Sequence, residues 1–391
     1  MSDVKVVTTE DGRSQFWLSG GGTGPAARIE GFDPDNDVLV LDRPDLSRAD
    51  LVFTDQEGAT VISVGPGGDE DQAVLVGVRA ADMNPAPLAR RLQEALQAGD
   101  VAGVVDLLAP DVVWEAPGPP DILPWAGRWV GPDAVATALH RMSATVGIED
   151  VTLERCITSG NTVAAVMTER GKAMESGLPY ESPAVRWVGV REGRIRSVQT
   201  YLDTFPCIEA VRGGRPFTVE VRPDAQTSVV QPLPAKRTTD SVVFDPAELE
   251  SPPATVRTVQ QMYGALAARD VAKLSEVFAS DVSWQMLGPP DLLPWAGPRQ
   301  GPQAAAESAA TILAVLKFDH VKPIRSIYQG DAVVVTLDEG GVTAAGGVPF
   351  KTSATHVIVI DGQGKVGSFR NVIDTSGMVE ACLGGRPFTV R

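Results

Sequence analysis

The stretch that decides the fold is GPPDILPWAG at residues 118–127, which returns as GPPDLLPWAG at residues 288–297. The two segments share nine of ten residues at an offset of 170 positions. A second pair, GGRPFTV at 213–219 and GRPFTV at 385–390, recurs at an offset of 171. Self-similarity at a fixed period marks a repeated structural unit, so the chain contains two copies of one domain.

Matching residues between these anchors set the limits of the two copies. Trp114 matches Trp284, and Asp203 matches Asp374. The one extra residue falls in a predicted turn near 361–365, where insertions are tolerated. We therefore place the copies at 87–222 and 254–391. The Pro-, Ser- and Thr-rich segment at 223–253 is interpreted as a linker with one short strand expected at 241–244.

Both copies show the same order of predicted elements. In the second copy, apolar residues recur at helical spacing over 256–270 and 271–279, and an Ala-rich helix that starts with Pro is expected over 301–316. Strands are expected at 282–286, 324–329, 332–339, 355–361 and 365–374. Helices followed by an antiparallel sheet predict the α+β class.

Residues 1–84 differ from both copies and form a small separate β domain. Short strand-like runs at 38–42, 49–55, 59–65 and 72–78 are separated by acidic or Gly-rich turns. This pattern predicts an antiparallel β unit.

Composition excludes several classes of protein. The formal charge of −16 argues against nucleic-acid binding, which needs a basic stripe. The chain has no run of 18 uncharged apolar residues and starts without a classical secretion signal, so we expect a cytoplasmic protein with no membrane contact.

Metal and cofactor sites are also not expected. The three cysteines (156, 207 and 382) and three histidines (140, 320 and 356) form no zinc-type spacing. Nucleotide-binding, serine-hydrolase and zinc-protease motifs are absent from the sequence. We therefore expect cofactor-independent chemistry.

The motifs resemble those of a known family. Helices, then D-V-x-W, P-W-A-G and G-P-x-A, then strands that end in an aspartate are similar to the SnoaL-like polyketide cyclases. These belong to the nuclear transport factor 2-like superfamily, which includes ketosteroid isomerase and limonene epoxide hydrolase. The resemblance implies two tandem cone-shaped α+β barrels, each around a pocket, with the two repeats joined as an internal pseudo-dimer and a homodimer possible.

The resemblance also implies catalytic positions. SnoaL-like cyclases use an aspartate on the last long strand as general acid/base, which matches Asp374 and Asp203, and a histidine on the preceding strand, which matches His356. The first repeat has Arg186 in place of that histidine. The alternative for Asp203 and Asp374 is helix N-capping, because each precedes Thr at a strand-to-helix transition. The alternative for His356 is a hydrogen-bonded core residue.

The early carboxylate of ketosteroid isomerase has no counterpart here. Its position falls at Ala116 and Met286, which disfavours steroid isomerisation and the epoxide hydrolases that use the same carboxylate.

Indole rings and a few polar groups are the candidate substrate-binding residues, since flat apolar walls suit a polycyclic ligand. Arg186 binds an anionic group or pairs with Glu181, and the pairing is favoured. The Pro-Trp-Ala-Gly tryptophans are interpreted as core or lid residues as well as pocket walls. The full set is Trp284, Trp295, Met286, Arg370, Trp114, Trp125, Tyr201 and Arg186.

The N-terminal part has a second resemblance, to the β cap of RTX calcium-binding repeats, carried by ARIEGFDPDNDVLVLD at 27–42. The glycine-rich nonapeptide repeats themselves are absent. Asp33, Asp35 and Asp37 alternate as calcium ligands do, but a solvated acidic turn is the favoured interpretation.

These observations lead to one functional prediction and three alternatives. We expect a cofactor-free cyclase or isomerase that acts on a hydrophobic, polyketide-type intermediate, with the second repeat catalytic and the first degenerate or ligand-binding. The alternatives are a non-catalytic protein that binds a hydrophobic small molecule for transport or self-resistance, a ring-opening or ring-closing epoxide hydrolase, and a structural module with filled barrels.

Overall fold

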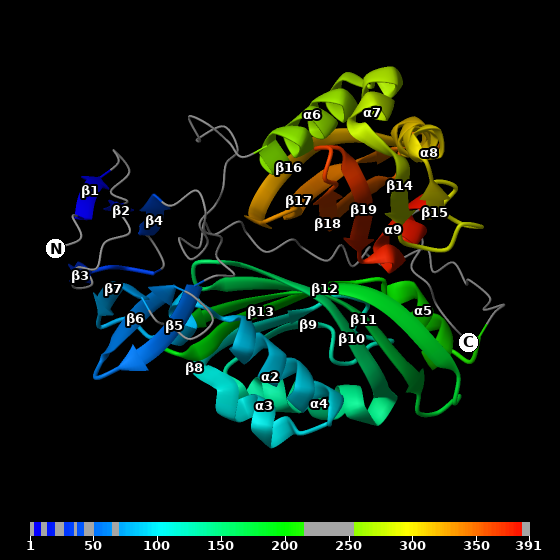
Figure 1. Ribbon diagram of the computed structural model, residues 1–391. Coiled ribbons are helices and arrows are strands. Elements are labelled where there is room, and N and C mark those ends of the chain that lie inside the picture. The colour runs from blue at the N-terminus through cyan, green and yellow to red at the C-terminus, as the bar shows by residue number, and fades with distance from the viewer. Residues whose placement is uncertain are drawn as a thin grey trace.

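The computed structural model describes residues 4–8, 14–19, 27–34, 37–42, 51–64, 70–214 and 254–384 (Figure 1). The predicted linker at 223–253, with its strand at 241–244, lies outside the described residues. So does most of the repeated GRPFTV motif.

Each repeat consists of helices packed on its own six-stranded sheet, which confirms the predicted α+β class. The first repeat contains α2 (Ala86–Gln97), α3 (Val101–Leu107), β8 (Leu108–Ala116), β9 (Gly127–Val130), α4 (Pro132–Thr145), β10 (Val146–Ser159), β11 (Thr162–Ala173), β12 (Pro179–Arg191), β13 (Arg194–Leu202) and α5 (Thr204–Val211). The second contains α6 (Ala254–Ala268), α7 (Val271–Val277), β14 (Phe278–Met286), β15 (Gly297–Gln300), α8 (Pro302–Val315), β16 (Leu316–Gln329), β17 (Ala332–Thr343), β18 (Pro349–Ile360), β19 (Val366–Ile373) and α9 (Thr375–Cys382).

The strand order is the same in both sheets. It runs β10-β11-β12-β13-β8-β9 in the first repeat and β16-β17-β18-β19-β14-β15 in the second. The early strand of each repeat pairs in parallel with the last, β8 with β13 and β14 with β19, and the other pairs are antiparallel.

Local sequence explains how the helices begin. Asp100 and Asp270 accept hydrogen bonds from the backbone N–H groups of residues 103 and 273, as N-cap residues do. Pro132 and Pro302 occupy the first turn of α4 and α8, where a missing N–H group has no cost.

The repeated GPPD segment has a conformational reason for its glycine. Gly118 and Gly288 have φ values of 111° and 122°. A Cβ atom at either position would lie 2.7 Å from a leucine Cδ1 atom, of Leu123 or Leu293. The segment therefore has to turn at a glycine.

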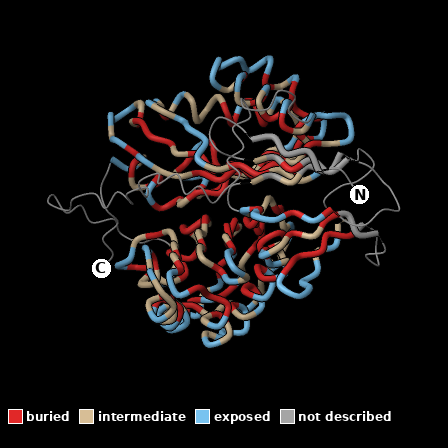
Figure 2. The backbone as a smooth tube through the Cα atoms, turned by 90° about the vertical axis from the view of Figure 1, so that its left-hand side faces the viewer, coloured by how far each residue is buried: buried red, intermediate tan, exposed pale blue. Residues whose placement is uncertain are grey.

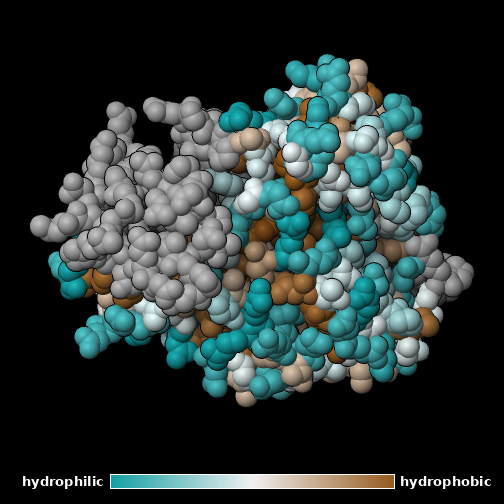
Figure 3. Space-filling view, viewed as in Figure 1, coloured by the Kyte–Doolittle hydropathy of each residue, from teal (hydrophilic) through white to brown (hydrophobic). Residues whose placement is uncertain are grey.

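The two sheets face each other, and helices α2–α4 and α6–α8 lie on the far sides of their sheets (Figure 1). Helices α5 and α9 contact each other between the repeats. In the perpendicular view, buried chain lies toward the middle of the molecule and exposed chain at its top and bottom (Figure 2). Brown, hydrophobic side chains reach the surface along the seam between the repeats, while the upper and lower surfaces are mostly teal (Figure 3). A hydrophobic cluster with members from both repeats fills this interface, among them Val185, Trp187, Tyr201, Val334 and Val372.

The N-terminal strands form two small sheets, not one purely antiparallel unit. One sheet has the order β1-β2-β4 and the other β3-β7-β6-β5. The pairs β2/β4 and β3/β7 are parallel, which corrects part of the prediction. The strands are β1 (Val4–Thr8), β2 (Ser14–Ser19), β3 (Ala27–Ile29), β4 (Val38–Asp42), β5 (Leu51–Gln56), β6 (Ala59–Val64) and β7 (Glu70–Val76), followed by helix α1 (Ala80–Met83).

Candidate functional site

A polar pair lies inside the second repeat, on the side of the sheet that carries the helices. His356, on β18, is 8% exposed, and its Nδ1 atom lies 2.8 Å from the hydroxyl oxygen of Tyr263 on α6. The two rings are stacked with centroids 5.9 Å apart, and the ring of Phe369 on β19 is tilted by 61° to the imidazole with a centroid distance of 4.8 Å. The helix and the sheet together therefore fix the orientation of the imidazole.

Both members of this pair are uncharged at neutral pH. Burial lowers the pKa of His356 to about 3, because the interior disfavours the imidazolium. Burial also raises the pKa of Tyr263, and the negative charge of Glu339 adds to that rise. When the tyrosine hydroxyl donates to Nδ1, the other ring nitrogen of His356 carries the proton and becomes a hydrogen-bond donor.

Glu339, on β17, is a carboxylate of the same interior that our sequence analysis missed. It is 8% exposed, and among the described residues its carboxylate has no hydrogen-bond or ion-pair partner. Burial, with a smaller contribution from the charge of Asp338, raises its pKa to about 7. A group with such a pKa transfers protons efficiently near neutral pH. The alternation of β17 could have revealed it, since Glu339 follows the core residues Val335 and Leu337 at every second position.

Asn371 is a further polar group on this side of the sheet. It lies directly opposite His356 in the register of β18 and β19 and is 5% exposed. Its Oδ1 atom is buried and has no hydrogen-bond partner within the described part of the chain. A buried unpaired carbonyl oxygen is costly, and a ligand hydroxyl group would satisfy it.

Aromatic rings form the apolar wall around these groups. Trp284 of β14 stacks on Phe369 with ring centroids 3.9 Å apart and an interplanar angle of 10°. Its Nε1 atom donates to Ser308 Oγ at 3.1 Å, and Ser308 in turn donates to the carbonyl oxygen of Trp295 at 2.9 Å. Trp284, Trp295 and Met286 belong to the core of the second repeat, so these three candidates do share one interior with His356.

Asp374 and His356, by contrast, are not brought together, which corrects the predicted catalytic pair. Asp374 caps helix α9 and accepts a hydrogen bond of 2.6 Å from Thr204 Oγ1 of the first repeat. Its neighbour Val372 belongs to the inter-repeat cluster, whereas Phe369 belongs to the barrel core with Trp284. The carboxylate of Asp374 therefore points to the interface and the imidazole of His356 to the interior.

Asp203 mirrors this arrangement in the first repeat. It caps helix α5 and accepts a hydrogen bond of 2.5 Å from Thr375 Oγ1 of the second repeat. Burial is the main reason why its pKa rises to about 6, and the charge of Asp374 adds to the effect. Each aspartate thus accepts a hydrogen bond from the threonine that follows the other aspartate, and these two hydrogen bonds join the repeats.

Two predicted substrate-binding residues also lie in the interface. Arg370 donates from Nη1 to both carboxylate oxygens of Glu154 at 2.9 Å, and its Nε atom donates to Gln285 at 3.1 Å. Tyr201 is a member of the inter-repeat hydrophobic cluster. Neither side chain faces a barrel interior, because both stand on the sheet face that the other repeat covers.

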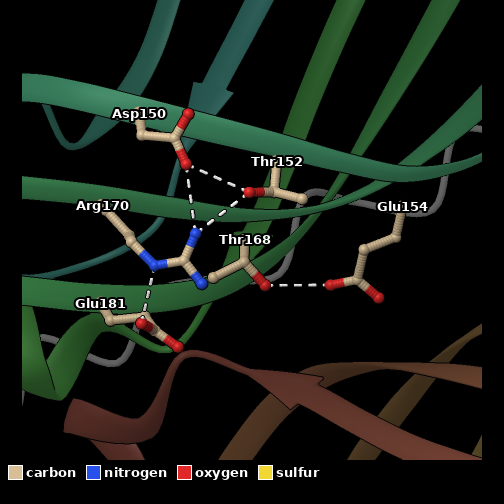
Figure 4. A network of polar contacts seen from close by, with 6 residues as sticks. All are labelled: Asp150, Thr152, Glu154, Thr168, Arg170 and Glu181. Atoms are coloured by element: carbon tan, nitrogen blue, oxygen red, sulfur yellow. Dashed lines mark hydrogen bonds and ion pairs between the residues drawn. The ribbon is translucent and has the colours of Figure 1, made fainter.

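Arg186 does not pair with Glu181, which corrects the favoured prediction for this residue. Glu181 accepts instead from Arg170, which also contacts Asp150 and Thr152, in a surface network next to the Thr168–Glu154 hydrogen bond (Figure 4). Arg186 is 7% exposed and lies in the interior of the first repeat, at the position of His356 in the second.

The first repeat lines its interior with residues at the same positions as the second. Gln93, Thr200 and Glu169 occupy the positions of Tyr263, Asn371 and Glu339. Arg186 donates to the Oε1 atom of Gln93 and, at 3.2 Å, to Thr200. The side chain of Trp114 is buried in this core, and Trp125 packs half-buried against a second cluster near α5.

The described residues contain no group of three or more His, Cys, Asp or Glu side chains that could hold a metal ion. Asp37 accepts backbone N–H groups of Asp33 and Ser14, as in an acidic turn. Asp35 lies outside the described residues. Within the same ranges, no helix is long and apolar enough to cross a membrane.

One family model matches the chain twice, once in each repeat. The model of the SnoaL-like domain family matches residues 89–198 and 259–368. An NTF2-like protein of known structure from Burkholderia xenovorans is 24% identical, with a TM-score of 0.28, and the match covers 32% of this chain and 94% of that protein. An LEH-like epoxide hydrolase from Mycobacterium tuberculosis is 25% identical, with a TM-score of 0.27, over 32% of this chain and 86% of the hydrolase.

The curated relatives include the ECF RNA polymerase sigma factor SigG of Mycobacterium tuberculosis. It is 25% identical over 187 residues, which make up 46% of this chain and 47% of SigG. The chain thus spans about half the length of the curated relatives that it matches.

Proposed function

Because this chain belongs to the SnoaL-like family and carries the family's domain twice, we propose that it is a cofactor-independent cyclase or isomerase. Its substrate would be a hydrophobic, polyketide-type intermediate bound inside the second repeat. The observation that carries this proposal is the set of polar groups Glu339, Tyr263 and His356 inside the hydrophobic core of the second repeat.

Each of these groups has a distinct task in the proposed reaction. Glu339 removes an acidic proton next to a substrate carbonyl group, because a carboxylate with a pKa near 7 is a competent base at neutral pH. In an aldol closure the resulting enolate attacks a second carbonyl carbon and forms the C–C bond. The new alkoxide takes a proton through the Tyr263–His356 pair, and the proton held by Glu339 returns to that pair through solvent.

The neutral state of His356 supports this assignment. A neutral imidazole donates a hydrogen bond to a substrate oxygen without protonating it first, as a positioned electrophile does. The interior that lowers its pKa also strengthens that hydrogen bond, because the local dielectric constant is low.

The first repeat lacks the groups for the same reaction. Arg186 stands where His356 does, and a guanidinium group keeps its proton in proteins. Glu169 occupies the position of Glu339, but it is half-buried and accepts a hydrogen bond of 2.9 Å from Tyr180. We therefore assign catalysis to the second repeat and ligand binding to the first.

Genetic complementation tests the proposal and separates it from the sequence-based assignment to Asp374. A strain that lacks the gene is complemented with the wild type, with Glu339→Gln or with Asp374→Asn, and its metabolites are profiled. We expect an uncyclised precursor to accumulate with Glu339→Gln and to be cleared by the wild type and by Asp374→Asn. Clearance by Glu339→Gln together with failure of Asp374→Asn would return the acid/base role to Asp374.

The second candidate is non-catalytic binding of a hydrophobic small molecule. Its motivation is that the curated relative is named as a sigma factor, a name that states no reaction for the part that matches this chain. Native mass spectrometry of the protein purified from its own host distinguishes the two functions. Binding alone predicts that one ligand is retained and released chemically unchanged by both the wild type and Glu339→Gln.

A further inference from the structure

A buried cation without a carboxylate partner lies inside the first repeat. Arg186 projects from β12 into the barrel and is 7% exposed. None of the described residues places a carboxylate within ion-pair distance of its guanidinium group. Burying an unpaired charge is one of the most costly arrangements in a protein, so this position needs an explanation beyond folding.

The hydrogen-bonding capacity of Arg186 is only partly used. A guanidinium group has five N–H donors, and here Nε donates to Thr200 while Nη1 donates to Gln93. The remaining donors have no partner among the described residues. They are arranged as a planar fork, the geometry that binds a carboxylate with two parallel hydrogen bonds.

Gln93 provides a second, independent indication of a ligand. It projects from helix α2, is 6% exposed, and uses its Oε1 atom to accept from Arg186. Its Nε2 atom is buried and has no hydrogen-bond partner in the described residues. A neutral N–H donor thus lies next to unused guanidinium donors, and the common partner for such a set is an oxyanion.

Glu169 is the carboxylate whose negative charge acts on Arg186, and it acts without contacting the guanidinium group. Its charge opposes the effect of burial, which lowers the pKa of Arg186. Its own Oε1 atom, however, accepts from the Tyr180 hydroxyl group, and it makes no ion pair with Arg186. Tyr180 also lines a hollow of about 430 Å³ between β12 and α5, together with Leu178, Pro206 and Glu209.

The second repeat shows what the same scaffold does without this charge. Tyr263 and His356 replace Gln93 and Arg186, and they too join a helix to a strand by one hydrogen bond. The fold therefore does not need an arginine here. We infer that the first repeat is a binding site for a small molecule with a carboxylate group, anchored by Arg186 and Gln93 and separate from the proposed catalytic interior of the second repeat.

Isothermal titration calorimetry with paired probes tests this inference. The full-length protein is titrated with 2-naphthoate and with trans-cinnamate, and each is compared with its uncharged amide, 2-naphthamide or cinnamamide. We expect at least one carboxylate to bind about tenfold or more tightly than its amide, since a hydrogen bond between charged groups is worth more than a neutral one. Failure of both carboxylates to bind, or equal affinity of acid and amide, would overturn the inference.

Two variants locate the binding. Gln93→Tyr combined with Arg186→His copies the pair that the second repeat already accommodates, so the double variant is expected to fold and to lose the preference for the acid over the amide. Glu339→Gln is expected to keep that preference. A preference that survives in the double variant, or one that disappears with Glu339→Gln, would place the anion elsewhere. Because Glu339 is also the proposed catalytic base, loss of turnover without loss of naphthoate binding would bear on the proposed function and not on this site.

Discussion

Replacing Glu339 with glutamine is expected to make the protein more stable at alkaline pH, even though the substitution removes the proposed catalytic base. The pKa of Glu339 rises from an ordinary 4.5 to about 7 in the folded protein, mainly because the side chain is buried. The folded state therefore binds this proton more tightly than the unfolded state does, and the free energy of unfolding falls as the pH rises through this interval. The loss of stability that ionised Glu339 causes is complete above pH 7 and absent well below pH 4.5.

The size of the effect follows from the two pKa values. Their difference means that Glu339 lowers the free energy of unfolding of the wild type by roughly 3 kcal/mol at pH 8 and by about 1 kcal/mol at pH 5. Glutamine has nearly the same shape and carries no charge at either pH. The variant should therefore gain close to these amounts relative to the wild type, less whatever its amide group loses by being buried.

Urea unfolding followed by tryptophan fluorescence at pH 8 and at pH 5 measures the difference. Glu169→Gln is the matched control, because it makes the same change at the same position of the first repeat. There it weakens the hydrogen bond from Tyr180, so we expect no gain in stability. A Glu339→Gln variant that is destabilised at pH 8, or that gains the same amount at both pH values, would refute the idea of a buried, unpaired carboxylate.

Three further perturbations test the interface and the packing. Asp374→Ala should lower the free energy of unfolding in urea by about 1–2 kcal/mol, because the α9 cap and the hydrogen bond across the interface are lost. Asp374→Asn should retain most of the cap and of that hydrogen bond. Equal losses of stability in the two variants would argue against capping. Gly341→Ala should cost more than about 2 kcal/mol or prevent folding, because its Cβ would lie 2.0 Å from a backbone carbonyl oxygen of β16. Gly264→Ala, in an open position on α6, should instead stabilise by up to about 1 kcal/mol, and similar midpoints for the two glycine variants would contradict the geometry. Arg370→Ala should lower the free energy of unfolding by about 1 kcal/mol, since the ion pair with Glu154 is partly exposed. A double-mutant cycle with Glu154 should show coupling between the two residues. Additive losses of stability would mean that the ion pair contributes nothing.

Much of the fold could be predicted from the sequence alone. The two GPPD segments revealed the repeat, because each needs a glycine with positive φ at the same turn. Helix starts were readable from local signals such as Pro302 in the first turn of α8. The predicted strands of the second repeat are present but several are longer, as with β16, which begins at Leu316 and not near 324. Strand ends depend on pairing with neighbours, and single-sequence patterns do not contain that information.

The candidate site was predicted less well. His356, Trp284 and Met286 were proposed as site residues of the second repeat. The structure places Trp284 and Met286 in the core of that repeat, where Phe369 also contacts the His356 ring. Tyr263 lies 93 positions from His356 along the chain and reaches it only through the packing of α6 on β18. No local pattern could have paired them.

Which face of the sheet a residue occupies depends on the packing of the whole chain. Strand alternation places Arg370 and Val372 on one side of β19, with Asp374 next in the same alternation, but it does not say which side that is. In a strand with one wet face, polar residues mark the outside. Here the helices cover one face and the other repeat covers the second, so most residues on both faces of β17 and β18 are buried, and polarity does not tell the two faces apart. The repeat, the elements and their order can be recognised in the amino-acid sequence. The docking of the two repeats through their sheets directs Asp374 toward the interface and leaves Glu339 and His356 inside.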